Sequence, residues 1–239
     1  MSTLPIPDPP KPSGGDVAHS LVRGGLSSIP YGGGVVGETF NMLVTPPLEK
    51  RRRRWEEQMV QVVKVLAEGK HVDIAALGQN EAFNSLLIQA TIAAMKTHLD
   101  EKLASLRNAV ANAALGQGPG DDLSLLFIRF VDEMTPLHLR VLKVVAEHEA
   151  KFAFVEGYGQ FFDQFSKIGA VEIAPELFKL VCEDLKARML LRISEHVADF
   201  DGLYEESSLL IEGKSPKPKL IVTKLGRKFI EFVLTDRTA

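Results

Sequence analysis

The sequence predicts a mainly α protein, in which a helical hairpin precedes a domain of helices that carries a small two-stranded β-wing. Apolar residues recur at helical spacing across about residues 48–115 and again across about 121–193. The glycine-rich letters GQGPG at 116–120 separate these two stretches. The period changes only near the C-terminus, where two short apolar runs flank KSPKPK, and this change predicts the wing.

The composition is typical of a globular protein with a sizeable core: the chain has 239 residues, 45% hydrophobic and 25% charged. The net charge of -3 excludes a polycation, so a contact with nucleic acid requires a local basic patch. A single cysteine, Cys182, excludes an internal disulfide and is typical of a reducing compartment. The start lacks the pattern of a secretory signal, and no apolar run reaches the roughly 18 residues of a membrane span. We therefore expect a cytoplasmic protein, with peripheral association with the inner membrane as the alternative.

The first half contains an arm and then the hairpin. Residues 1–16 are rich in proline, glycine and serine and predict a disordered arm. Residues 17–116 form the expected N-terminal domain, a glycine-rich segment followed by two long helices. Pro47 suits the first turn of the first long helix. Asn80 is the expected N-cap of the second, which continues to about Leu115.

The second half, residues 121–239, forms the expected C-terminal domain. Asp121 and Thr135 are the expected caps of its first two helices. A later helix over 176–193 precedes two strands, one within 207–213 and one within 219–226, and a helix closes the chain. The apolar face of the helix over 176–193 consists of Leu177, Val181, Leu185 and Met189.

Three helices, a two-stranded wing and a terminal helix follow the order of a winged helix-turn-helix domain. The letters LIVTKLGRKFIEFV resemble the end of many winged-helix domains, where a strand of the wing carries a threonine and a Leu-Gly turn opens the last helix. In this sequence the matching residues are Thr223, Leu225, Gly226, Phe229 and Phe232. The resemblance covers the C-terminal domain and implies a winged-helix fold for it.

The whole chain resembles a family of uncharacterised bacterial proteins, and more loosely the abortive-infection alpha-type proteins of phage defence. The matching pieces are IPYGGGVVGETF, PLEKRRRRW, QNEAFNSLLIQAT and EKLASLRNAVANAAL. The family of uncharacterised proteins has no assigned reaction, so the resemblance to it implies an architecture. The looser resemblance implies a role in stress or phage defence.

Glycines in the N-terminal half have the G-x-G-x-x-G spacing of a dinucleotide-binding loop at Gly32, Gly34 and Gly37. The context excludes that loop, because Pro30 interrupts the position of the preceding strand and no acidic residue follows on a second strand. A Walker A loop is excluded too, since no Gly-Lys-Ser/Thr follows.

We expect Gly33 and Gly37, which form a G-x-x-x-G pair, to lie on one face of a short helix that packs on the hairpin, because small residues at this spacing let helices approach closely. The alternative is insertion at an anionic membrane surface, with the basic run at 50–54 among the lipid headgroups and Trp55 as an interfacial anchor. The expected packing or membrane face consists of Gly33, Val36, Gly37, Phe40, Leu43, Val44 and Trp55.

Two basic segments are candidate contacts for an anion or a nucleic acid. Successive arginines of the run 51–54 point in different directions on a helix, and Glu49, Glu56 and Glu57 are available to pair with them. In the wing, no acid interrupts the basic residues between 214 and 228. The candidate contacts are Arg51, Arg53, Arg54, Lys214, Lys217, Lys219, Lys224, Arg227 and Lys228.

No catalytic or metal motif is present in the sequence. The six histidines form no pair with metal-ligand spacing, and no G-x-S-x-G elbow occurs. Cys182 is expected to be a buried core thiol. We therefore expect a non-enzymatic bacterial interaction or regulatory protein that needs no cofactor and uses its winged helix to dock a protein partner. The alternatives are a DNA-binding regulator on duplex DNA and an effector at an anionic membrane surface, and the long helices also permit a homodimer.

Overall fold

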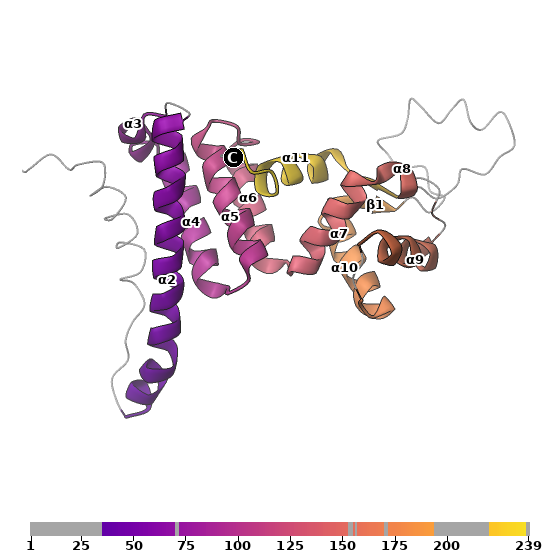
Figure 1. Cartoon of the computed structure of the whole chain (residues 1–239), viewed down its shortest axis with the longest axis horizontal. Coiled ribbons are helices and arrows are strands. Elements are labelled where there is room, and N and C mark those ends of the chain that lie inside the picture. Colours follow the sequence, from indigo (N-terminus) through magenta and orange to yellow (C-terminus); the bar gives the residue numbers. More distant parts are fainter. Residues whose placement is uncertain are drawn as a thin grey trace, which may run out of the picture. The chain divides into compact units, whose positions relative to one another are not determined.

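The computed structural model describes residues 35–69, 72–152, 155, 157–169, 172–193 and 220–237; residues 35–43, 193 and 220 are described by their backbone alone. The described chain is mainly helical, as predicted, and contains one two-stranded sheet (Figure 1). It divides into two compact units, Met1–Asp132 with Arg237–Ala239, and Glu133–Asp236. The arm expected over 1–16 lies outside the described residues.

The first described helix, α2 (Val35–Gly69), is longer than expected. We expected a separate helix to begin at Pro47, but Pro46 and Pro47 both lie inside α2, so the predicted boundary is wrong. The φ angle of proline suits a helix, and what proline lacks is the N–H that would donate to the carbonyl one turn earlier. Two adjacent prolines therefore remove hydrogen bonds from the same turn, and the helix continues on both sides of it. After a short helix, α3 (Ile74–Gly78), the chain turns back toward α2.

The second long helix of the predicted hairpin is in fact two helices, α4 (Glu81–Lys96) and α5 (Asp100–Ala114). Thr97 is buried in an extended conformation, and its Oγ1 accepts a hydrogen bond from the backbone N–H of Leu99 at 3.1 Å. Asp100 then opens α5, where the helix dipole favours a carboxylate. The expected hairpin is therefore wrong, and α2, α4 and α5 pack against one another as three helices.

Small residues fill much of the contact between α4 and α5. Ala90, Ala93 and Ala94 are buried on α4, and Leu106 and Ala109 are buried on α5. Alanines at such a contact let two helix backbones approach closely. Helix α6 (Asp121–Glu133), which we expected to open the C-terminal domain, groups with this unit.

The second unit contains four helices before its sheet and one after it in the described chain: α7 (Pro136–Glu147), α8 (Glu149–Phe152), α9 (Gly157–Gly169), α10 (Pro175–Ala187), β1 (Leu191–Ile193), β2 (Leu220–Val222) and α11 (Lys224–Val233). The strands are antiparallel, with Arg192 opposite Ile221. The strand expected within 207–213 lies outside the described residues. The strand expected within 219–226 ends at Val222, where Thr223 caps the next helix.

The helix expected over 176–193 is wrong at its end, because α10 stops at Ala187 and Leu191 begins a strand. Met189 turns the chain with a φ of 58°. The N–H of Leu190 then donates to the carbonyl of Leu185 at 3.0 Å, and both leucines are fully buried. This is the Schellman ending of a helix, with methionine in the position that glycine usually occupies.

Phenylalanines form the centre of this unit between α8, α9 and α10. Phe161 and Phe178 have ring centroids 4.7 Å apart, and Phe152 packs edge-on against Phe161 at 5.4 Å. All three are buried. Such edge-to-face pairs add about 0.5–1.5 kcal/mol beyond the burial of their area. This aromatic core holds α10 in place and so determines which of its side chains face outward.

Candidate interaction surfaces

The arginine run on α2 holds the turn between α4 and α5. Nη1 of Arg51 donates to the carbonyl of Met95 at 3.1 Å, at the C-terminal end of α4. Arg54, one helical turn further on, forms an ion pair with Asp100 in the first turn of α5. A cation at a helix C-terminus and a carboxylate at an N-terminus are both favourable to the helix dipoles. These two guanidinium groups therefore stabilise both sides of one turn.

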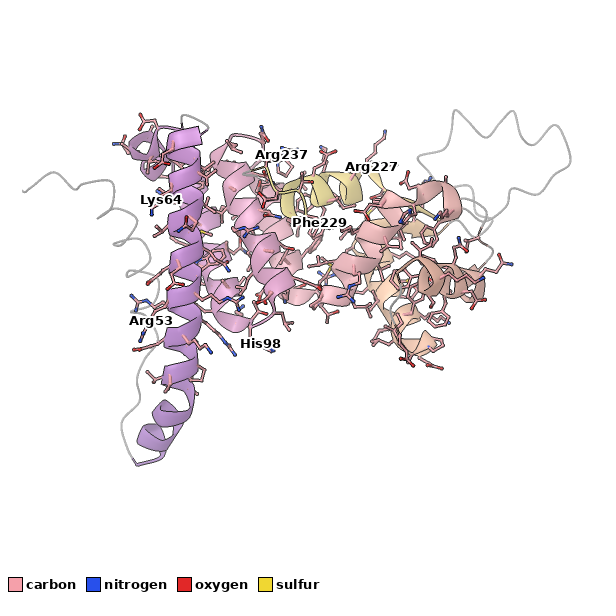
Figure 2. The ribbon with its side chains drawn as sticks, in the orientation of Figure 1. Arg53, Lys64, His98, Arg227, Phe229 and Arg237 are labelled. Carbon is pink, nitrogen blue, oxygen red and sulfur yellow. The ribbon has the colours of Figure 1, made fainter. Side chains whose placement is uncertain are left out.

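The other two arginines pair along α2 itself. Nε of Arg52 lies 2.8 Å from Oε1 of Glu56, and Nη2 of Arg53 lies 3.5 Å from Oε2 of Glu49. Exposed pairs at this spacing contribute about 0.3–0.5 kcal/mol. Arg53 and Lys64 extend from α2 on the side away from α4 and α5 (Figure 2). The run is therefore divided among separate partners within the chain.

The expected packing or membrane face is described only in part. Trp55 is fully buried, and its Nε1 donates to Oγ1 of Thr91 on α4 at 3.0 Å. A tryptophan in this position packs inside the helical unit and offers no anchor to a membrane surface. Val44 is half-buried on α2. Gly33 and the side chains of Val36, Phe40 and Leu43 lie outside what the structure describes, whereas the backbone of Gly37 lies within α2.

Two lysines bind the end of α6. Nζ of Lys96 lies 2.6 Å from Oδ2 of Asp132, and Nζ of Lys102 donates to the carbonyl of Asp132 at 2.7 Å. Burial lowers the pKa of Lys102, which the charge of Asp132 partly offsets. Sequence reasoning did not find this contact, because the partners are far apart in the chain.

The basic wing is described only where it enters α11. Lys214, Lys217 and Lys219 lie outside the described residues. Arg227, on α11 in Figure 2, donates to both carboxylate oxygens of Glu149 at 2.8 Å. Lys224 and Lys228 are exposed on the same helix. Of the basic residues predicted here, Arg227 is thus engaged within the unit, and these two lysines face solvent.

The start of α11 is fitted closely to the end of α10. Oγ1 of Thr223 accepts from the N–H of Gly226 at 2.9 Å and donates to the carbonyl of Met189 at 2.6 Å. The N–H of Thr223 donates to the carbonyl of Leu190 at 3.2 Å. A Cβ on Gly226 would lie 2.2 Å from that same carbonyl oxygen. The Thr-x-x-Gly spacing in the sequence is therefore what lets α11 begin beside β1.

The outward side of α10 is apolar with an acidic border. Val181 and Leu185 are buried as expected, but Leu177 is 47% exposed, Leu180 66% and Met189 67%, so the predicted apolar face is wrong at both ends. At about 100° per residue, Leu177, Leu180 and Ala187 share one side of the helix. We call these three exposed residues the α10 face. Glu176 and Glu183 lie along one border of it.

Two contacts from Tyr158 on α9 position charged residues of α10. Its hydroxyl donates to Oε1 of Glu183 at 2.5 Å. Nζ of Lys179 lies 5.6 Å from the centre of its ring. Of the two glutamates at the border of the α10 face, Glu183 is therefore held in place by the unit itself.

A buried histidine joins α7 to α10. Nδ1 of His138 accepts from the N–H of Thr135 at 3.2 Å, so Nε2 carries the proton and faces Oδ2 of Asp184 at 3.2 Å. Arg188 then bridges Asp184, at 3.0 Å, and Glu133, at 2.9 Å. Burial lowers the pKa of His138, although the charge of Asp184 opposes the shift. The sequence suggested the Thr135 cap but not this network, whose other members are Asp184 and Arg188 at the end of α10 and Glu133 at the end of α6.

Cys182 is buried in this unit, and burial raises the pKa of its thiol, which makes it a poor nucleophile. Among the described residues, no group of His, Cys, Asp and Glu side chains is arranged to hold a metal ion. No helix in the described part of the chain is long and apolar enough to cross a membrane.

Comparison with protein-family models, with curated proteins and with solved structures finds no match to this chain. The resemblances noted in the sequence therefore remain hypotheses. The observations that bear on function are the exposed side chains of α10 and α11 described above.

Proposed function

We propose that the second unit is a winged-helix docking module through which this chain acts as a non-enzymatic interaction or regulatory protein. The order of elements supports the fold, because α10 directly precedes the first strand of the sheet and α11 follows the second. In a winged-helix domain, the helix in the position of α10 is the one that meets a partner.

The single observation that carries the proposal is the chemistry of the α10 face. A helix that reads DNA presents amide and cationic side chains to the base edges. Here the outward side presents Leu177 and Leu180, bordered by Glu176 and Glu183. The exposed cations of this helix contact groups of the unit itself: Lys179 lies over the ring of Tyr158, and Lys186 lies 4.0 Å from Glu183. Carboxylates in this position repel phosphates, whereas large apolar side chains at the centre of a contact contribute much of the affinity between proteins. The face therefore suits a protein surface better than duplex DNA.

The chemistry of the α10 face also indicates which kind of protein surface it binds. The apolar centre requires an apolar patch on the other protein, and the two glutamates favour a lysine or arginine at one side of that patch. The resemblance to bacterial phage-defence proteins suggests a partner from such a system.

Co-purification with the tagged full chain from its own cells tests the proposal. The double substitution L177D/L180D places two charges on the face without touching the buried side of α10. We expect a protein that co-purifies in stoichiometric amount with the wild-type chain to be lost from this variant. K143E, which changes an exposed lysine on α7, is the matched control and should retain it. A partner retained by L177D/L180D would contradict docking through the α10 face.

The second candidate is a DNA-binding regulator, supported by the exposed Lys224 and Lys228 and by the basic residues that precede them in the sequence. This function predicts salt-dependent binding of duplex DNA, because lysine contacts release counterions from phosphates. K224E/K228E should then abolish a gel shift that L177D/L180D leaves intact. The absence of any shift for the wild-type chain at low salt would exclude this function.

A further inference from the structure

The first unit contains a cavity that is separate from the surfaces described above. It has a volume of about 210 Å³ and lies where the start of α4, the loop at 116–120 and the start of α6 meet. Phe83, Leu86 and Ala113 give it apolar walls, and Leu125 of α6 adds to them. The cavity therefore offers a partly apolar site of limited size.

Polar groups at the cavity favour a cation nearby. Ser124 lines it and is only 6% exposed. Asp121 lines it too, and Asp122 is exposed next to it in the sequence. The two carboxylates favour a positively charged group on a partner bound at the cavity.

The chain already places one cation on the loop that borders the cavity. Arg237, close to the C-terminus, donates to the side-chain oxygen of Gln117 (Figure 2). Gln117 lies between Gly116 and Gly118, which both line the cavity. The loop that borders the cavity therefore already binds one basic side chain of this chain.

The size indicates what the cavity holds. Sites for drug-sized ligands are about 300–1,000 Å³, and this cavity is smaller. A single large side chain that fills a pocket is the usual centre of a contact with a peptide or protein. We propose that the cavity binds one large apolar side chain of a peptide segment whose neighbouring residues are lysine or arginine. Ser124, which lines the cavity, then offers its hydroxyl to the backbone of that segment.

Synthetic peptides test this site on the full chain. The probe is acetyl-Lys-Arg-Leu-Arg-Lys-amide, with one control that has alanine at the centre and another that has glutamates in place of the basic residues. Binding is followed by the chemical shifts of backbone amides. We expect the leucine peptide to bind at least about tenfold more tightly than the alanine peptide, because only leucine fills the apolar cavity. We also expect the shifts to map to the cavity and the affinity to fall as salt is added.

Two variants separate the cavity from general attraction. A113F fills the cavity from α5 and should abolish binding. D121N removes one carboxylate with little change of shape and should weaken binding about threefold. E176Q, which removes a carboxylate from the first turn of α10, should leave binding unchanged.

Four results would overturn the proposal. The alanine peptide binding as tightly as the leucine peptide would show attraction of charge alone. Equal affinity for the peptide with glutamates and the peptide with basic residues would show that the charge of the neighbouring residues does not contribute to recognition. Chemical-shift changes confined to α10 would place the contact elsewhere. Undiminished binding of the leucine peptide by both single variants, D121N and A113F, would do the same. None of these results depends on the function proposed for the second unit, because the peptide and the variants concern the first.

Discussion

The carbonyl oxygen of Leu190 lies 2.2 Å from where the Cβ of any other residue would be at Gly226. This contact joins the end of α10 to the start of α11, and Val222 closes the same space at 2.8 Å. The two segments are far apart in the sequence, and the glycine determines how closely they approach. The position of α10, and thus of its outward face, depends on this contact.

The first prediction concerns this glycine. G226A should lower the free energy of unfolding by more than about 2 kcal/mol, because the backbone around Leu190 has to move to admit a methyl group. Urea denaturation of the full chain measures the loss. The control is G159A, on α9, where a Cβ meets nothing within 4 Å. That change should be neutral or stabilising by up to about 1 kcal/mol. Equal stability of G226A and the wild type would contradict the described contact.

A second prediction concerns the turn at Met189, whose φ of 58° is unfavourable for a residue with a side chain. M189G should keep or raise stability, by up to about 1 kcal/mol, since glycine adopts this conformation freely. M189V should lower it by about 1–2 kcal/mol, because a β-branched residue suits this conformation least. Thermal melts of both variants measure the difference. The reverse order would mean that the chain does not turn at Met189 as described.

The third prediction compares arginines that are neighbours in the sequence. R51A should cost about 1–2 kcal/mol, since Arg51 bonds to a carbonyl at the end of α4. R53A should change stability by less than about 0.5 kcal/mol, because Arg53 makes only an exposed pair with Glu49. Chemical denaturation of the two variants side by side is the measurement. Equal losses would show that the run acts through its total charge and not through the turn between α4 and α5.

A fourth prediction follows from His138, whose pKa is lowered by burial from the ordinary value of 6.5. The unfolded chain then binds a proton at His138 more readily than the folded chain does. The stability that neutral His138 contributes is therefore complete above pH 6.5 and is lost as the pH falls below that value. The charged groups that face His138 and its partners are Asp184 and Arg188 at the end of α10 and Glu133 at the end of α6. A comparison of the wild type with H138Q keeps these groups in both proteins, so the difference between the two reports on His138.

The unfolding free energy measured between pH 8 and pH 5 should therefore fall more steeply for the wild type than for H138Q. Glutamine keeps a side chain that can accept from the cap at Thr135 but does not titrate. Parallel curves for the two proteins would show that His138 does not change its protonation with folding in this range.

The order of the elements could largely be predicted from the sequence, but several of their ends could not. The apolar period continues through Thr97, so nothing in the pattern announces the break between α4 and α5. The letters after Arg188 continue the apolar character of α10, and the turn depends on a methionine in a conformation that is usually marked by glycine. Thr223 and Gly226, by contrast, could be found because a local cap and a local spacing determine their roles.

The candidate surfaces were harder to predict, because they depend on partners far along the chain. Arg51 and Arg54 read as part of a basic patch, and only the packing of α2 on the next two helices shows what they bind. Leu177 read as a core residue of an amphipathic helix. Its exposure depends on where the phenylalanine core of this unit places α10, which helical periodicity alone does not determine.

Photo-crosslinking in the chain's own cells tests the central claim most directly. Benzoylphenylalanine is placed singly at Leu177 and at Leu180 on the α10 face, at Lys167 on the exposed side of α9, and at Lys228 on α11. We predict that the two positions on the α10 face crosslink to the same protein and that Lys167 does not. Adducts with that protein from Lys167 but from neither leucine, or adducts with DNA alone from the leucines and Lys228, would contradict docking of a protein partner through α10.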